Sequence, residues 1–126
     1  MGLQSFENFK RLEQFLEFII PANLRFAFEF RHEIWHNERV YKTLKKYMSA
    51  CVIADSPKYP TAEVVTSKFV YVRMHGSKIL SDSNYTDEEL ETMAQNIKEW
   101  LKDSLDVYIY FNNDFRGYAV ENAKKL

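Results

Sequence analysis

Two short segments of the chain each place an arginine two residues away from an acid or a base. Glu29 and Arg31 form the first pair, and Arg73 and His75 form the second. In an extended strand, residues two apart lie on the same face, so each pair presents its side chains together. Glutamate and histidine can transfer protons, and arginine can hold an anion through two parallel hydrogen bonds. We therefore expect Glu29 and His75 to be catalytic and Arg31 and Arg73 to bind substrate.

Both pairs also have a purely structural explanation. A carboxylate beside a guanidinium on a half-buried face commonly forms a structural ion pair. A histidine in such a place is commonly satisfied within the fold. For Glu29 or Arg31 alone, the structural explanation is the stronger one, and for His75 it competes with a site role. The repetition of the spacing on two separate segments is what favours a site.

Asp55 is a further candidate for the catalytic set. It ends an apolar stretch immediately before Ser56 and Pro57, which mark a turn. An aspartate in this position often accepts hydrogen bonds from backbone amides two residues later. A capping role and a catalytic role are therefore equally compatible with the pattern.

Further substrate contacts are expected from polar and aromatic residues that follow the same stretches. They are His32, Trp35, Asn112, Asn113 and Asp114. Asparagine and aspartate can hold substrate hydroxyls, although they are also common turn formers. Trp35 follows a predicted strand, where an aromatic ring can form the wall of a pocket.

No metal or other cofactor is predicted. Glu29, His32, Asp55 and His75 are ligand types that divalent metals use, so the residue types alone leave such an ion open. However, no two of them have the close spacing of a His-x-x-x-His or Cys-x-x-Cys site. The three glycines are too scattered for a phosphate-binding loop or a dinucleotide fingerprint.

Four predicted β-strands position these candidates, at residues 25–32, 50–55, 69–75 and 107–114. In each strand one face is almost purely apolar: Phe26, Phe28, Phe30, Val52, Ala54, Val70, Val72, Met74, Val107, Ile109 and Phe111. The opposite faces carry Ala27, Tyr71, Tyr108 and Tyr110, followed by the candidate residues towards the strand ends. Parallel α/β sheets build their sites at the carboxyl ends of their strands. An antiparallel sheet with one wet face would also alternate, but no Asn-Gly or Asp-Gly dipeptide occurs and the intervals are long, which favours parallel strands.

Helical periodicity fills most of the remaining chain. Helices are predicted at residues 5–19, at 37–48, after a capping box formed by Thr86 and Glu89, and after Gly117. The inward face of the third helix is predicted as Leu90, Met93, Ala94, Ile97 and Leu101, and that of the last helix as Ala119, Val120 and Ala123. The order predicts a single α/β domain over residues 1–126, with parallel strands, crossover helices and about four βα units.

Composition excludes several classes of function. The 126 residues carry 17 basic and 18 acidic side chains spread along the chain, so no basic stripe points to a nucleic-acid partner. No stretch is long and apolar enough for a signal peptide or a membrane span. The single cysteine, Cys51, lies in an apolar strand and is predicted to be a buried hydrophobe, which fits a reducing cytoplasm.

Three motifs in a fixed order resemble those of one known family. They are Glu29-Phe30-Arg31-His32, Tyr71-Val72-Arg73-Met74-His75-Gly76 and Tyr110-Phe111-Asn112-Asn113-Asp114. The chain resembles the YecE-like family, also called domain of unknown function 72, from about Phe6 to the end. Residues 119–123 are also similar to that family's ending.

The resemblance implies a TIM-like βα barrel, sometimes compared with sugar isomerases and sugar-phosphate enzymes, with no established reaction. It places nine of the candidate residues around the mouth of the barrel: Glu29, Arg31, His32, Asp55, Arg73, His75, Asn112, Asn113 and Asp114. Such a barrel needs about 250 residues. The resemblance therefore implies that this chain corresponds to the carboxyl-terminal half, without the amino-terminal half.

Two classes of function follow as hypotheses. The first is an enzyme acting on a small polar or anionic metabolite, such as a sugar or sugar phosphate. The second is a non-catalytic α/β module that binds a metabolite or a protein, or an inactive barrel fragment. A closed ion-pair network between Glu29 and the arginines would favour the second, and open groups around a cavity would favour the first.

A homodimer is the expected assembly. Four parallel strands leave two open sheet edges, and open edges promote pairing with another chain. Two copies would supply the eight strands of a closed barrel.

Overall fold

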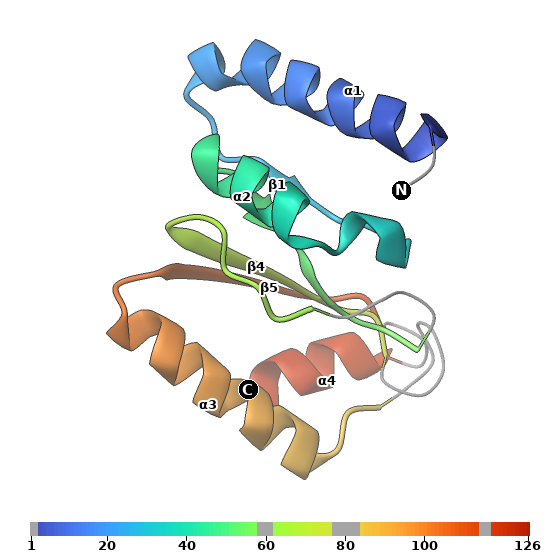
Figure 1. Ribbon diagram of the computed structural model, residues 1–126. Coiled ribbons are helices and arrows are strands. Elements are labelled where there is room, and N and C mark those ends of the chain that lie inside the picture. Colours follow the sequence, from blue (N-terminus) through green and yellow to red (C-terminus); the bar gives the residue numbers. More distant parts are fainter. Residues whose placement is uncertain (1–2, 58–61, 77–83, 114–116) are drawn as a thin grey trace.

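The structure is a computed structural model that describes residues 3–57, 62–76, 84–113 and 117–126 (Figure 1). Asp114, one of the predicted substrate contacts, lies outside the described residues. The elements in chain order are α1 (Leu3–Ile19), η1 (Ile20–Ala22), β1 (Ala27–Phe28), η2 (Glu33–Trp35), α2 (Glu38–Lys46), β2 (Ala50–Cys51), β3 (Ile53–Asp55), β4 (Phe69–Met74), α3 (Asp87–Lys102), β5 (Asp106–Phe111) and α4 (Tyr118–Lys125).

All strand pairs are parallel, as predicted, and each strand pairs with its neighbour in the sequence. β1 pairs with β2, and β3, β4 and β5 form a second ladder in that order. Only Val52 separates β2 from β3, and its N–H still donates to the carbonyl of Phe28 at 2.9 Å. The chain therefore forms four neighbouring parallel segments, and the prediction of an α/β fold with crossover helices is confirmed.

Local sequence signals set the ends of two helices. The Asn37 side chain accepts the N–H of Val40 at 3.0 Å and caps α2. At α3, the side chain of Thr86 accepts the N–H of Glu89, and the Glu89 carboxylate accepts the N–H of Thr86, both at 3.1 Å. This reciprocal pair is the predicted capping box, and it fixes where the chain turns from loop into helix.

The apolar side chains form two cores, one for each half of the sheet. The first joins α1, α2 and the first two strands, with Phe9, Leu12, Leu16, Ile19, Val40, Tyr41, Leu44 and Cys51 buried. The second joins β3, β4, β5 and α3, with Ile53, Val70, Val72, Met74, Tyr85, Leu90 and Met93 buried. Figure 1 shows α1 and α2 beside β1, and α3 and α4 beside β4 and β5. The opposite face of the sheet carries Glu29 and Arg73.

The prediction of which side chains of the second strand lie on the apolar face of the sheet is wrong. Ala54 pairs in register with Arg73, and Asp55 pairs with Met74, so Ala54 shares the polar face and Asp55 shares the apolar one. The expectation was the reverse. Residues 50–54 are apolar without interruption, which is typical of a strand buried on both faces, so alternation could not reveal their orientation.

Several helical side chains also depart from the predicted inward faces. In α4, Ala119 is buried as expected, whereas Val120 and Ala123 are exposed and Asn122 is buried. Leu101, near the end of α3, is 56% exposed. In α4 the inward position goes to a polar residue because Asn122 makes three hydrogen bonds to neighbouring elements, which are described below.

Cys51 is buried in the first core, as predicted. Burial raises the pKa of its thiol to about 11, so the thiol stays protonated and behaves as a small apolar group. Among the helices that the structure describes, none is long and apolar enough to cross a membrane.

Candidate functional site

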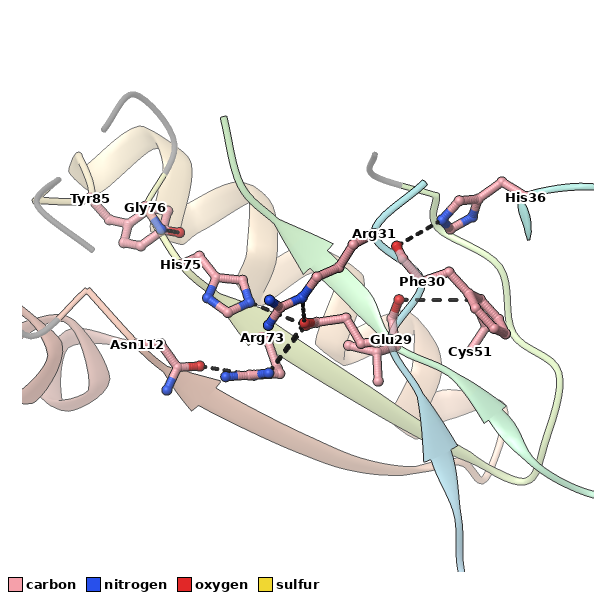
Figure 2. A network of polar contacts seen from close by, with 11 residues as sticks. Glu29, Phe30, Arg31, His36, Cys51, Arg73, His75, Gly76, Tyr85 and Asn112 are labelled. Carbon is pink, nitrogen blue, oxygen red and sulfur yellow. Dashed lines mark hydrogen bonds and ion pairs between the residues drawn. The ribbon is translucent and has the colours of Figure 1, made fainter. Parts of the chain in front are cut away.

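Four candidate residues lie at the carboxyl ends of three parallel strands. Glu29 directly follows β1, Arg73 lies near the end of β4, His75 directly follows β4, and Asn112 directly follows β5. Because the strands are parallel, their ends meet at one edge of the sheet. Figure 2 shows the side chains of these residues and of Arg31 converging on the Glu29 carboxylate or on Arg73.

The Glu29 carboxylate is the centre of this network. It accepts hydrogen bonds from Arg31 Nε at 3.2 Å and from Arg73, whose terminal nitrogen lies 3.3 and 3.4 Å from its two oxygens. His75 Nε2 lies 3.1 Å from Glu29 Oε2, a hydrogen-bond distance when this nitrogen carries the proton. Arg73 Nε in turn donates to Asn112 Oδ1 at 3.1 Å. The network therefore links β1, β4 and β5 through one carboxylate.

The surroundings of Glu29 keep it ionised. Burial raises its pKa, because only 11% of the side chain is exposed. The hydrogen bond from His75 and the charge of Arg73 lower the pKa by more, and Arg31 adds to this. The resulting pKa lies below the ordinary value for glutamate. A carboxylate with a lowered pKa is a strong electrostatic partner and a weak proton acceptor.

An open groove runs from this network along the polar face of the sheet. Its volume is about 430 Å³, and its lining residues are Arg25, Ala27, Glu29, Val52, Phe69, Tyr71, Arg73, Tyr108 and Tyr110. The rings of Tyr71 and Tyr110 stack with their centroids 5.1 Å apart. The groove thus has a charged end at Glu29 and Arg73 and an aromatic middle.

A second ion pair closes the groove at the amino ends of the strands. Arg25 donates to Asp106 Oδ2 at 2.7 Å and to the Tyr108 hydroxyl at 3.0 Å. Its guanidinium also lies over the Phe69 ring, 5.2 Å from the centroid. The sequence analysis missed Arg25 as a site residue. Arg25, Ala27 and Glu29 are each two residues apart, so they lie on the same face of the strand, and this spacing could have revealed Arg25.

The Asp55 side chain lies apart from the network that it was expected to join, although its backbone carbonyl accepts the N–H of His75 at 2.8 Å. It lines a separate cavity of about 220 Å³ on the helix-covered face, together with Ile53, Met74 and Tyr85. Burial, followed by the hydrogen bond to Asp55, raises the pKa of Tyr85. The Tyr85 hydroxyl also accepts the N–H of Gly76 at 2.8 Å. The reversed facing of the second strand explains this position.

His32 and Trp35 also lie away from the groove. His32 is exposed and directly precedes η2. The Trp35 ring stacks on Phe30, with centroids 5.3 Å apart, and packs against the first core. The neighbouring His36 lies within hydrogen-bond distance of the Tyr41 hydroxyl, at 3.0 Å, and of the Phe30 carbonyl, at 3.3 Å. This segment therefore supports the fold around α2.

Of the two described asparagines after β5, only Asn112 joins the Glu29 network. Asn113 is fully buried and donates to Asn122 Oδ1 at 2.7 Å. Asn122 also accepts the N–H of Tyr85 at 3.2 Å and donates to Asn84 Oδ1 at 2.9 Å. Asn113 thus ties the end of β5 to α4. Sequence reasoning missed Asn122, because a polar residue on a short helix gives no sign that it faces inward.

Within the residues that the structure describes, no group of three histidine, cysteine, aspartate or glutamate side chains is arranged to hold a metal ion. Glu29 contacts His75, and the two other side chains that contact Glu29 are those of Arg31 and Arg73. Two guanidinium groups beside one carboxylate give the site a positive environment, which suits an anion better than a cation.

Two of the comparisons with known proteins point to one family. A model of the family described as protein of unknown function DUF72 matches residues 3–126. A search of curated proteins found no significant match.

Solved structures of two DUF72 family proteins share the fold. The protein from Thermotoga maritima is 27% identical over 88% of this chain and 48% of its own, with a TM-score of 0.74. The protein from Enterococcus faecalis is 18% identical over 99% of this chain and 52% of its own, with a TM-score of 0.77. The chain thus spans about half the length of these solved relatives, consistent with half a barrel. Because the family model covers nearly the whole sequence, the chain belongs to the DUF72 family.

Proposed function

We propose that the Glu29 end of the groove binds a small anionic metabolite that also carries hydroxyl groups, with sugar phosphates as the chemical class. The observation that supports this is the charge of the network. Arg31 and Arg73 both contact the carboxylate of Glu29, so two guanidinium groups meet at the carboxyl ends of the strands. In parallel α/β folds this is the edge where ligands bind.

The individual groups suit the two parts of such a ligand. The side chain of Arg73 is 31% exposed and that of Arg31 is 53% exposed, so neither side chain is sealed from solvent while it holds Glu29. Arginine donates in parallel to phosphate or carboxylate oxygens. The ionised Glu29 and the amide of Asn112 can accept hydrogen bonds from hydroxyl groups. The ring faces of Tyr71 and Tyr110 supply the apolar wall that most ligand pockets have.

A catalytic role is the second candidate, and the contact between His75 and Glu29 favours it. A carboxylate that contacts one ring nitrogen of a histidine fixes the tautomer of the ring and stabilises its protonated form. In this reading His75 transfers the proton and Glu29 orients it, because the low pKa of Glu29 makes it a poor base. However, the network is closed upon itself, with Glu29 held by three side chains, which favours ligand binding over proton transfer.

Ligand binding can be tested with calorimetric titrations of inorganic phosphate, glucose and glucose 6-phosphate. We expect glucose 6-phosphate to bind more tightly than either part alone. The variant R73Q loses a charge-assisted contact of about 1.5–3 kcal/mol, which weakens binding roughly 10- to 100-fold.

The matched control is K98Q, which removes one positive charge from the exposed face of α3, away from the groove. It should bind like the parent chain. Equal binding by R73Q and the parent for every ligand that binds would refute the proposed site. Proton transfer is addressed separately by H75Q, which should leave the affinity nearly unchanged if His75 acts only in catalysis.

A further inference from the structure

The guanidinium group of Arg73 is held from both sides of its strand. On one side, Glu29 directly after β1 accepts from Arg73 Nη1 at 3.3 and 3.4 Å. On the other side, Asn112 directly after β5 accepts from Arg73 Nε at 3.1 Å. Figure 2 shows the Arg73 side chain between these two partners. Because a guanidinium is planar and rigid, contacts at two of its nitrogens fix the direction in which the whole group faces.

The chemistry of arginine determines which groups remain for a ligand. Arginine has five N–H donors and no acceptor, so the amide of Asn112 must turn its oxygen towards Nε. Within residues 3–57, 62–76, 84–113 and 117–126, the third nitrogen of Arg73, Nη2, has no hydrogen-bond partner. The Arg73 side chain is also 31% exposed. The two anchored nitrogens therefore leave Nη2 as the donor that an incoming anion can use.

Asparagine anchors this arginine without adding a charge. Glu29 already places one carboxylate beside Arg73. An aspartate at position 112 would accept the same hydrogen bond from Nε, but it would bring a second negative charge close to the place where an anion is expected to bind. A neutral acceptor thus suits a residue that orients Arg73 towards an anion, whereas a purely stabilising partner could equally be a carboxylate.

Asn112 is itself fixed on both sides along the chain. Its backbone N–H donates to the carbonyl of Met74 at 2.8 Å, one residue beyond Arg73. The next residue, Asn113, is fully buried and donates to Asn122 Oδ1 at 2.7 Å. The short side chain of Asn112 therefore projects from a rigid backbone. Arg73 is ordered before a ligand arrives, so binding does not carry the entropic cost of ordering this long side chain.

We propose that Asn112 is the positioning residue of the anion site. It fixes the plane of the Arg73 guanidinium so that Nη2 donates to an oxygen of the bound anion. This inference rests on the ligand-binding role proposed for the groove, and it gives Asn112 an effect on anion binding that acts through Arg73. The alternative is a direct hydrogen bond from the Asn112 amide to the anion.

The first test needs no ligand. Heteronuclear NMR at mildly acidic pH follows the Nε–H of Arg73, and R73K identifies this signal by removing it. N112L removes the acceptor, so the signal should shift and its hydrogen exchange should become on the order of tenfold faster. N112D keeps an acceptor oxygen and should retain slow exchange. The matched control is N96L, the same substitution at a half-buried asparagine on α3, which should leave the signal unchanged.

The second test measures the binding of inorganic phosphate, which has no sugar hydroxyls for Asn112 to contact. N112L should weaken phosphate binding roughly three- to tenfold, because Arg73 must then be ordered on binding. In the R73K background the same substitution should change the affinity less than about twofold, since lysine has no Nε donor and no plane to orient. N112D should also weaken phosphate binding, through its charge, although it keeps the Nε–H protected.

Three results would overturn the role assigned to Asn112. The first is an Nε–H signal that N112L leaves unchanged, and the second is a signal that N96L alters as much as N112L does. The third is an equal loss of phosphate binding from N112L in the parent and in R73K, which would make Asn112 a direct ligand contact. If the parent binds neither phosphate nor glucose 6-phosphate, the proposed function fails, whereas the NMR comparison still decides whether Asn112 orients Arg73.

Discussion

At the scale of single residues, Glu29 has the most consequential environment. It lies one residue beyond a two-residue strand, so that strand contributes little to holding it. The side chains of Arg31, Arg73 and His75 contact its carboxylate and hold it in position. Conversely, the Glu29 carboxylate places a negative charge beside both guanidinium groups. The carboxylate therefore has a structural role whatever ligand the groove takes.

The first prediction concerns the pH dependence of this role. The pKa of Glu29 is lower in the folded than in the unfolded chain, whose value is roughly 4.3. Its contribution to stability is therefore complete above the unfolded pKa and is lost as the pH falls through the folded pKa. Urea unfolding should show the parent to be more stable than E29Q at pH 7, with a difference that shrinks below about pH 4.

The control for the pH dependence is E99Q, on the exposed face of α3. Its difference from the parent should stay small, within about 0.5 kcal/mol, across the same range. A gap between the parent and E29Q that stays constant down to about pH 2 would contradict the role assigned to Glu29.

At the scale of elements, the buried Asn122 fixes α4 to the rest of the fold. Its side chain joins Asn113 after β5, Asn84 and the backbone of Tyr85, so three chain segments meet at one amide. α4 has only eight residues, which is too short for a helix to be stable by itself. Buried hydrogen bonds and the packing of Ala119 therefore hold it in place.

The second prediction follows from this arrangement. N122A removes the oxygen that accepts hydrogen bonds from the Asn113 side chain and from the Tyr85 N–H. We therefore expect the free energy of unfolding to fall by about 2 kcal/mol and Tm to fall by roughly 8 °C. The control Q95A removes an exposed amide on α3 and should change Tm by little. An N122A variant as stable as Q95A would mean that α4 is held by other contacts.

The third prediction concerns the capping box of α3. T86A removes the acceptor for the N–H of Glu89 and should cost about 1 kcal/mol. Thr92 lies within the same helix and donates to the carbonyl of Glu88 in the preceding turn, so T92A serves as the control and should be nearly neutral. Chemical denaturation of both variants measures the difference, and equal stability would argue against a stabilising cap.

The elements show what the sequence could and could not predict. Parallel strands and the capping box were predictable because alternation and the Thr-x-x-Glu spacing are local signals. The convergence of Glu29, Arg73 and His75 could be predicted because residues two apart lie on one face of a strand and parallel strands end at one edge of the sheet. Asp55 was misplaced because its strand is apolar on both faces, and Asn122 was missed because its partners are far away in sequence. Long-range pairing of polar groups leaves no periodic trace in a single sequence.

At the scale of the whole molecule, the two cores are joined mainly through the centre of the sheet. β4 pairs with β3 on one side and β5 on the other, over six residues with β5. β1 pairs with β2 over only two residues. The centre of the sheet should therefore open rarely, whereas the first strand should open often.

Hydrogen exchange provides the fourth prediction. The amide of Val72 in β4 should exchange on the order of a hundredfold more slowly than that of Ala27 in β1, because Val72 is fully buried in a strand with two neighbours. Exchange of individual amides, followed by NMR at neutral pH, tests this. Similar protection at the two positions would mean that the edge strand is covered or that the sheet opens as one unit.

The order of strand pairing also has a consequence for synthesis on the ribosome. Each strand pairs with the strand just before or after it in the sequence. A nascent chain can therefore add each strand to an edge that already exists, and it need not wait for a distant segment. The contact between Arg25 and Asp106, 81 residues apart, is different, because both ends must have left the ribosome before it can form. This ion pair can therefore form only after Asp106, the first residue of β5, has been synthesised.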